Sequence, residues 1–160
     1  MTYISYITYY EDWPKLDNCL IQEALYIRDN EENIFPFKSS PYKLYLVNDL
    51  LKNFTSEFLK FNHKIHLHSF NFVPIHIDVN RTEAYNYIID TGGPNVKTLF
   101  YNLNDFTILG PGDIKKVNEN CEPVEAVSIR PNVWHKINVL VPHTVINIET
   151  VRTGLTITPI

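Results

Sequence analysis

The sequence has few of the residues on which disulfide-rich, secreted and membrane proteins depend. It contains two cysteines, Cys19 and Cys121, and its first ten residues show neither the basic start nor the apolar run of a secretory signal. No window approaches the roughly 18 consecutive apolar residues of a membrane span. We therefore expect a soluble, cytoplasmic protein with reduced thiols and no membrane partner.

Clustered basic residues are also missing. The chain carries 14 Lys and Arg against 18 Asp and Glu, and the basic residues are scattered, whereas nucleic-acid-binding proteins gather positive charge in runs or on one face. Neither cysteine lies in a glycine-rich elbow, and the turn Gly110-Pro111-Gly112-Asp113 lacks the following Lys-Ser/Thr of a phosphate-binding loop. Nucleic-acid binding, covalent catalysis and a phosphate-binding loop are thus not expected.

Strand-forming residues, in contrast, are abundant. Aromatic residues make up 13% of the chain, and glycine is limited to five residues, a balance that favours β-strands. Short strand-like runs follow one another with turn signals and no helix-length pattern between them, which excludes parallel βαβ units. We predict a mainly β protein with amino-terminal helices, folded as a double-stranded β-helix (a cupin-like jelly roll). The predicted strands are 65–70, 72–78, 84–89, 96–101, 107–109, 124–129, 134–140, 144–151 and 155–160.

The first part of the chain has a helical pattern instead. Apolar residues near helical spacing follow Pro14, and Asn48 or Asp49 can cap a second helix that carries Leu50, Phe54 and Phe58 on one face. We expect a single domain over residues 1–160, in which a helical cap (1–62) precedes the jelly-roll core (63–160).

The strongest chemical signal lies in the run Ile75-His76-Ile77-Asp78. Residues two apart on a strand point to the same face, so the His76 imidazole and the Asp78 carboxylate converge on one point. A 2-His-1-carboxylate metal site needs one further histidine from a distant strand. His135 is the natural candidate, because it opens an alternating strand 135 − 76 = 59 residues later, where an antiparallel chain can return. The predicted metal ligands are His76, Asp78 and His135.

A rival pair has the same geometry. His66 and His68 are also two apart on a predicted strand and could chelate a metal as a His-x-His pair does. An isolated His-x-Asp is more often a strand face in water, so spacing alone does not choose between the two pairs. The sequence around His76 and Asp78 favours them.

The preference for His76 and Asp78 over the rival pair rests on three segments: Ile75 to Ile88, Thr98 to Tyr101, and Val133 to Glu149. In order and spacing they resemble small Fe(II)/2-oxoglutarate-dependent oxygenases of phage and bacterial type, which are related to the aspartyl/asparaginyl β-hydroxylases. The resemblance implies Fe(II) held by the three predicted ligands, 2-oxoglutarate and O2 at the open positions, and hydroxylation of an unknown substrate.

One position departs from that family. Its members usually carry an Arg about ten residues past the distal His, where the guanidinium grips the far carboxylate of 2-oxoglutarate as a fork. Here the neighbourhood reads Pro142-His143-Thr144, and His143 can offer one hydrogen bond but not a fork. Arg81 and Arg152 are the alternatives, although Arg152 lies 152 − 135 = 17 residues past the predicted ligand.

Asn86, Thr98 and Tyr101 match positions that line the cosubstrate pocket in the resembling enzymes. Thr98 and Tyr101 lie on opposite strand faces by parity, so both cannot easily line one pocket, and an ordinary strand role suits them equally. Trp134 points away from the face of His135 by the same alternation and is expected to pack in the core.

Two other functions stay open at this point. One is a cupin-like metalloenzyme that does not use 2-oxoglutarate, and the other is a non-catalytic jelly-roll module in which His76 and Asp78 are relics. Neither the substrate, a small molecule or a peptide, nor the oligomeric state can be derived from the sequence. Residues 1–41 are expected either to contribute to specificity or simply to pack.

Overall fold

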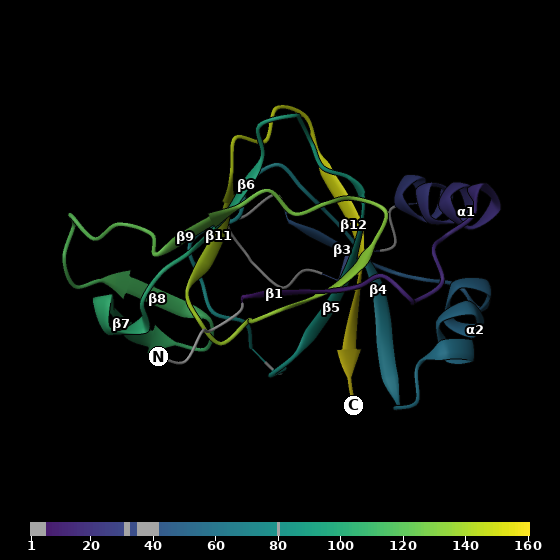
Figure 1. The fold of residues 1–160 in the computed structure, drawn as a ribbon, viewed down its shortest axis with the longest axis horizontal. Helices are drawn as coiled ribbons and strands as arrows, with labels where there is room; N and C mark the ends of the chain where they lie inside the picture. Colours follow the sequence, from purple (N-terminus) through teal and green to yellow (C-terminus); the bar gives the residue numbers. More distant parts are fainter. Residues whose placement is uncertain (1–5, 31–32, 35–41, 80) are drawn as a thin grey trace.

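The structure is a computed structural model in which residues 6–30, 33–34, 42–79 and 81–160 are described. Strands dominate these residues and form a seven-stranded sheet, a three-stranded sheet and a hairpin, all antiparallel (Figure 1). The strands are β1 (Ile7–Tyr10), β2 (Asn33–Ile34), β3 (Lys43–Leu46), β4 (His63–Phe70), β5 (Ala84–Asp90), β6 (Lys97–Phe100), β7 (Phe106–Gly110), β8 (Asp113–Lys116), β9 (Glu125–Val127), β10 (Trp134–Ile137), β11 (His143–Ile146) and β12 (Arg152–Pro159).

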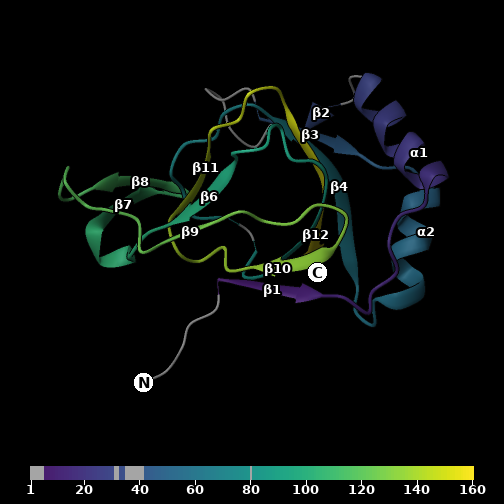
Figure 2. The same cartoon turned by 45° about the horizontal axis from the view of Figure 1, so that its top comes forward.

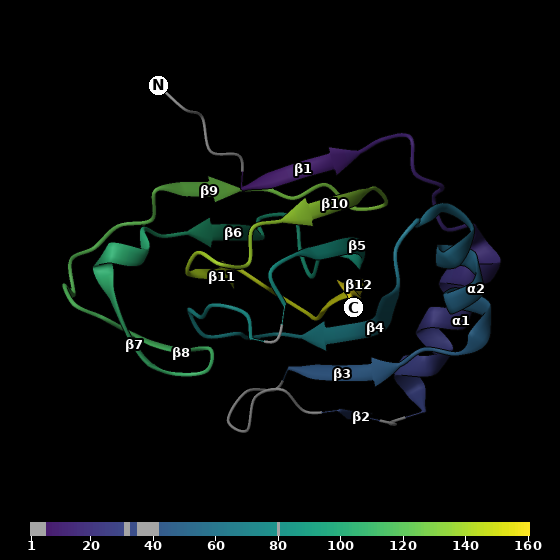
Figure 3. The ribbon, with the colours of Figure 1, turned by 90° about the horizontal axis from the view of Figure 1, so that it is seen from below.

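The strand order is that of a jelly roll, as predicted. The larger sheet runs β1-β10-β5-β12-β4-β3-β2 and the smaller sheet runs β11-β6-β9 (Figure 3). The chain therefore passes repeatedly from one sheet to the other, which wraps the two sheets around a common interior. The segment before β5 joins the smaller sheet through a single bridge between His76 and His143.

Two helices cover the outer face of the larger sheet (Figure 2). They are α1 (Asn18–Asp29) and α2 (Asp49–Phe58), and each begins at a polar cap: Asp17 accepts from the Leu20 N–H at 2.9 Å, and Asn48 accepts from the Leu51 N–H at 3.3 Å. Both predicted helices are thus confirmed. The predicted buried face of α2 was wrong at one position, because Leu50 is exposed.

Strand parity gives the larger sheet an apolar outer face and a polar inner face. On β12, Leu155 and Ile157 are buried with the helices in the outer core. Trp134 of β10 is buried there too, and its indole N–H donates to the Pro14 carbonyl at 2.8 Å, so its predicted core role is confirmed. The inner face instead carries one polar residue from each of four paired strands, in the register His135, Asn86, Thr156 and His66.

Some strands were not predicted. β1 pairs with β10, and β3 pairs with β4, so residues before 63 extend the larger sheet in addition to supplying its helices. The predicted strand 72–78 is paired only at the His76 bridge, and the hairpin partner β8 was not predicted, since only its first residue, Asp113, was assigned, to a turn. No helix among the described residues is long and apolar enough to cross a membrane.

Candidate metal centre

The inner face of the larger sheet and the facing smaller sheet border a cavity of about 820 Å³. Tyr101 lies outside it, because its ring packs against Phe106 at a centroid distance of 5.6 Å and beneath the Lys116 ammonium. The structure thus does not bring Tyr101 to a cosubstrate pocket, in keeping with the opposite parity of Thr98. The other predicted site residues all line the cavity: His76, Asp78, Arg81, Asn86, Thr98, His135, His143 and Arg152.

Three of these residues form the one group of potential metal donors found among the described residues. In this group, one ligand atom each from His76, Asp78 and His143 lies within 4.8 Å of the others. The Nε2 atoms of the two histidines are each 3.3 Å from Oδ1 of Asp78, and the two rings are 4.4 Å apart. The third member of the group is therefore His143, in place of the expected His135.

Backbone pairing explains this choice. His76 and His143 face each other across the bridge and exchange two backbone hydrogen bonds of 3.1 and 2.9 Å. The Asp78 N–H donates to the Val139 carbonyl at 3.0 Å, so the chain from Val139 to His143 runs beside the His-x-Asp segment. His135 instead lies on β10, which pairs with β1 and β5 in the larger sheet.

The two histidines of the group turn their Nε2 atoms toward the carboxylate. Nδ1 of His76 lies 2.7 Å from the Pro74 carbonyl, and Nδ1 of His143 lies 2.8 Å from the Val141 carbonyl. A carbonyl can only accept, so each Nδ1 carries a proton, and Nε2 is the ring atom that faces Oδ1 of Asp78. Each Nε2 can therefore share a proton with the carboxylate or, once that proton is released, offer its lone pair to a metal ion.

Asp78 is held in its ionised form. Burial acts to raise the pKa of this carboxyl, but hydrogen bonding to His143 and His76 and the positive charge of Arg81 outweigh burial and hold the pKa well below its usual range. Its second oxygen, Oδ2, accepts from Nε of Arg81 at 2.6 Å. One carboxylate and two neutral imidazoles carry a net charge of −1, which suits a divalent cation.

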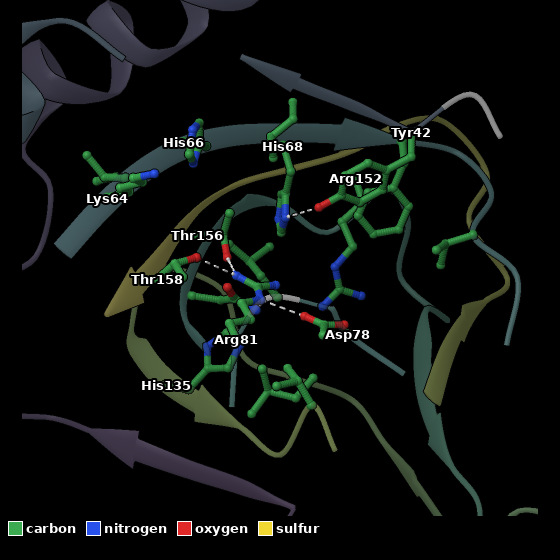
Figure 4. Close-up of a pocket in the computed structure, with 18 of the residues that line it drawn as sticks. Tyr42, Lys64, His66, His68, Asp78, Arg81, His135, Arg152, Thr156 and Thr158 are labelled. Atoms are coloured by element: carbon green, nitrogen blue, oxygen red, sulfur yellow. Dashed lines mark hydrogen bonds and ion pairs between the residues drawn. The ribbon is translucent and has the colours of Figure 1, made fainter. Parts of the chain in front are cut away.

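A buried cation lies in the same cavity. The Arg152 side chain extends from β12 into the cavity (Figure 4), the residue is 5% exposed, and in the described part of the chain no acceptor or acid pairs with it. Burial lowers its pKa to about 10, so the guanidinium is still charged at neutral pH. An unpaired buried charge costs several kcal/mol. Arg152 therefore calls for an anionic ligand.

Two neutral histidines accompany Arg152. Burial lowers the pKa of His135 to about 4 and that of His68 to about 3, and the nearby charge of Arg152 acts in the same direction on both. Nδ1 of His135 lies 3.4 Å from the Val133 carbonyl, and Nδ1 of His68 lies 3.3 Å from the Tyr42 hydroxyl. The buried polar atoms without a hydrogen-bond partner that line this cavity are Nε2 of His68, Nε2 of His135, Oδ1 of Asn86 and Oγ1 of Thr98. Such atoms are rare in folded proteins, and each can form a hydrogen bond with water or with a polar ligand in the cavity.

Comparison with known proteins gives distant matches only. No family model matches the chain, and no curated protein does. Among solved structures the chain is similar to Bacillus subtilis oxalate decarboxylase. A deletion mutant of that enzyme gives a TM-score of 0.45 and 14% identity over 81% of this chain, and an oxalate decarboxylase structure on substrate binding mode gives a TM-score of 0.42 and 15% identity over 79%. The chain spans 28% of the length of each of these chains, and the function has to be judged from the site itself.

Proposed function

We propose that this protein is an Fe(II)-dependent oxygenase that uses 2-oxoglutarate and O2 to hydroxylate its substrate, with His76, Asp78 and His143 as iron ligands. The observation that carries the proposal is that a 2-His-1-carboxylate group lines one cavity with Arg152, a buried cation that pairs with none of the described residues. Two histidines and a carboxylate with open positions are typical of non-haem Fe(II) oxygenases. An arginine fork is the group that best recognises a carboxylate.

The spacing along the chain supports the cosubstrate. With His143 as the distal ligand, Arg152 follows 152 − 143 = 9 residues later, close to the separation of about ten residues in the oxygenases that this sequence resembles. The apparent departure from that family therefore disappears once the distal ligand is His143. Arg152 would hold the far carboxylate of 2-oxoglutarate.

The residues of the site would act mainly by positioning. Bound iron supplies the reaction with O2, for which side chains alone have no equivalent. The Pro74 and Val141 carbonyls accept hydrogen bonds from Nδ1 of His76 and His143. These bonds orient both rings so that Nε2 is the atom that can bind the metal. Arg81 engages Oδ2 of Asp78, which leaves Oδ1 to face the two imidazoles. Apolar side chains such as Ile88 also line the cavity, beside the polar groups of the site.

An anaerobic titration with Fe(II) and 2-oxoglutarate tests the proposal. Wild-type protein should develop the visible charge-transfer band of the iron chelate. We expect R152Q to bind Fe(II) normally but to need at least about thirtyfold more 2-oxoglutarate, because it loses a buried charge partner. The matched control is R130Q, since Arg130 is an exposed residue paired with Glu11. Bound iron without a band would refute the use of 2-oxoglutarate and would favour a cupin-like metalloenzyme that does without it.

A further inference from the structure

A second group of basic side chains lines the same cavity beyond Arg81. Lys64 and His66 are on the inner face of β4, in register with Thr158 and Thr156 of β12. In Figure 4, Lys64, His66 and Thr158 lie on one side of Arg81, and Asp78 lies on the other. We call the space between Lys64, His66 and Arg81 the basic recess.

Arg81 joins this recess to the metal centre. Its Nε donates to Asp78 at 2.6 Å, and its Nη1 donates to the hydroxyls of Thr156 and Thr158 at 2.8 and 3.2 Å. These bonds fix the plane of the guanidinium, because Nε and Nη1 donate on opposite sides of it. Nη2 makes no hydrogen bond to any residue that the structure describes, so two of the five N–H donors are left for a ligand.

The positive charge of the recess is not balanced by acids. The described acids that line the cavity are Asp78, which Arg81 already engages, and Asp49, an exposed residue in the first turn of α2. Lys64 forms no ion pair with a described residue. Burial lowers the pKa of His66, and the positive charges of Lys64 and Arg81 lower it further. Both cations therefore lie close enough to His66 to affect its protonation. On the α2 side, Lys52 adds a further cation, and its ammonium donates to the His63 carbonyl.

We propose that the basic recess binds an anionic group, a carboxylate or a phosphate, of the substrate that the oxygenase modifies. This inference rests on the proposed function and names the substrate class of the same site. Arg152 is assigned to the cosubstrate, which leaves Lys64, His66 and Nη2 of Arg81 for the substrate. Because Arg81 also contacts Asp78, an anion held there lies one side chain away from the metal ligands.

NMR titration of the Zn(II)-loaded protein with inorganic phosphate and, separately, with succinate tests the recess, in the presence of 2-oxoglutarate. We expect saturable shifts at Lys64, His66 and Arg81 with at least one anion, and no shift with neutral succinamide. The double variant K64Q/H66Q should weaken that binding at least tenfold. K60Q, which removes a lysine that does not line this cavity, should not. A response to phosphate alone indicates a phosphorylated substrate, and a response to succinate alone indicates a carboxylic acid.

The same spectra separate this inference from the proposed function. Shifts at Arg152 and His135 on adding 2-oxoglutarate report the cosubstrate, whereas shifts at Lys64 and His66 report the recess. If neither anion shifts the recess residues, or if K64Q/H66Q binds the anion as well as wild type does, the recess proposal is wrong even when 2-oxoglutarate binds. If the anions bind at the recess but 2-oxoglutarate leaves Arg152 unchanged, the recess is supported and the cosubstrate assignment fails.

Discussion

The histidines of the cavity differ in what their Nε2 atoms face. Those of His76 and His143 face a carboxylate, whereas those of His135 and His68 are buried without a partner among the described residues. Burial keeps the latter two neutral and lowers their pKa values to about 4 and about 3. Nearby positive charge strengthens this effect, so any ligand that reaches them meets acceptors or neutral N–H donors rather than cations.

His135 should therefore make folding sensitive to acid. Its pKa is about 4 in the folded protein and about 6.5 in an unfolded chain, so between these values the unfolded state binds the extra proton. Stability is complete above about pH 6.5 and falls as the pH drops toward 4. We expect H135Q to remove roughly 2 to 3 kcal/mol of that loss, measured by urea unfolding of metal-free protein at pH 7 and pH 4.5. An unchanged pH dependence in H135Q would show that His135 is not buried as described.

The proximity of two of the predicted site residues follows from the sequence at this scale. Strand parity brings His76 and Asp78 to one face, which needs only local geometry. The partner strand is a long-range property, and no local pattern shows that His143, rather than His135, lies opposite His76. One signal in the sequence agrees with the grouping of His143 with His76 and Asp78: Arg152 follows His143 by 152 − 143 = 9 residues, whereas no arginine lies about ten residues after His135.

At the scale of single elements, β12 is the strand on which the cavity depends most. It pairs with both β4 and β5 and carries Arg152, Thr156 and Thr158 on its inner face. Gly154 lies between these residues, where a Cβ atom would come within 2.7 Å of the Tyr87 carbonyl oxygen and 3.0 Å of Nε2 of His68. The strand therefore has no room for a side chain at this position.

We expect G154A to lower the free energy of unfolding by about 1 to 3 kcal/mol, because the contact with the Tyr87 carbonyl forces the backbone to move. Urea unfolding of the two alanine variants G154A and G110A measures the difference. G110A is the matched control, since a Cβ atom at Gly110 would meet nothing within 4 Å. Equal losses of stability in both variants would contradict the close packing of β12 on β5.

The elements that were predicted and those that were not differ in their physical basis. The run 65–70 begins with an alternation of apolar and polar residues because one face meets the helices and the other the cavity, whereas the run 84–89 was predicted from its Tyr and Ile residues. β8 escaped prediction because this polar, partly exposed strand of a hairpin has no buried face to impose a pattern. Leu50 was wrongly predicted on the buried face of α2, because helical spacing groups residues into faces but does not show which face packs against the sheet.

For the molecule as a whole, the metal centre links the smaller sheet to the segment before β5. The His76 bridge is the pairing that joins the two, and a metal held by His76, Asp78 and His143 would join them at a second point. Metal binding should thus stabilise the whole fold, because the unfolded chain does not assemble the site.

We expect divalent iron, or manganese as its redox-stable substitute, to raise the thermal unfolding temperature of the wild-type protein. At one hundred times the dissociation constant the gain is about 2.7 kcal/mol. D78N should lose this stabilisation, whereas D113N, at an exposed turn-proximal residue, should keep it. Equal metal-dependent stabilisation in wild type and D78N would mean that Asp78 holds no metal, as in a non-catalytic jelly-roll module.

Anaerobic equilibrium binding of Fe(II) to the H143A and H135A variants tests the metal centre most directly. His143 is the cross-strand neighbour of His76, whereas His135 lies on the larger sheet beside Asn86. We predict that H135A binds Fe(II) about as tightly as wild type, and that H143A binds it roughly a hundredfold more weakly or worse. The reverse result, with binding lost in H135A and kept in H143A, would contradict the metal centre described for this protein.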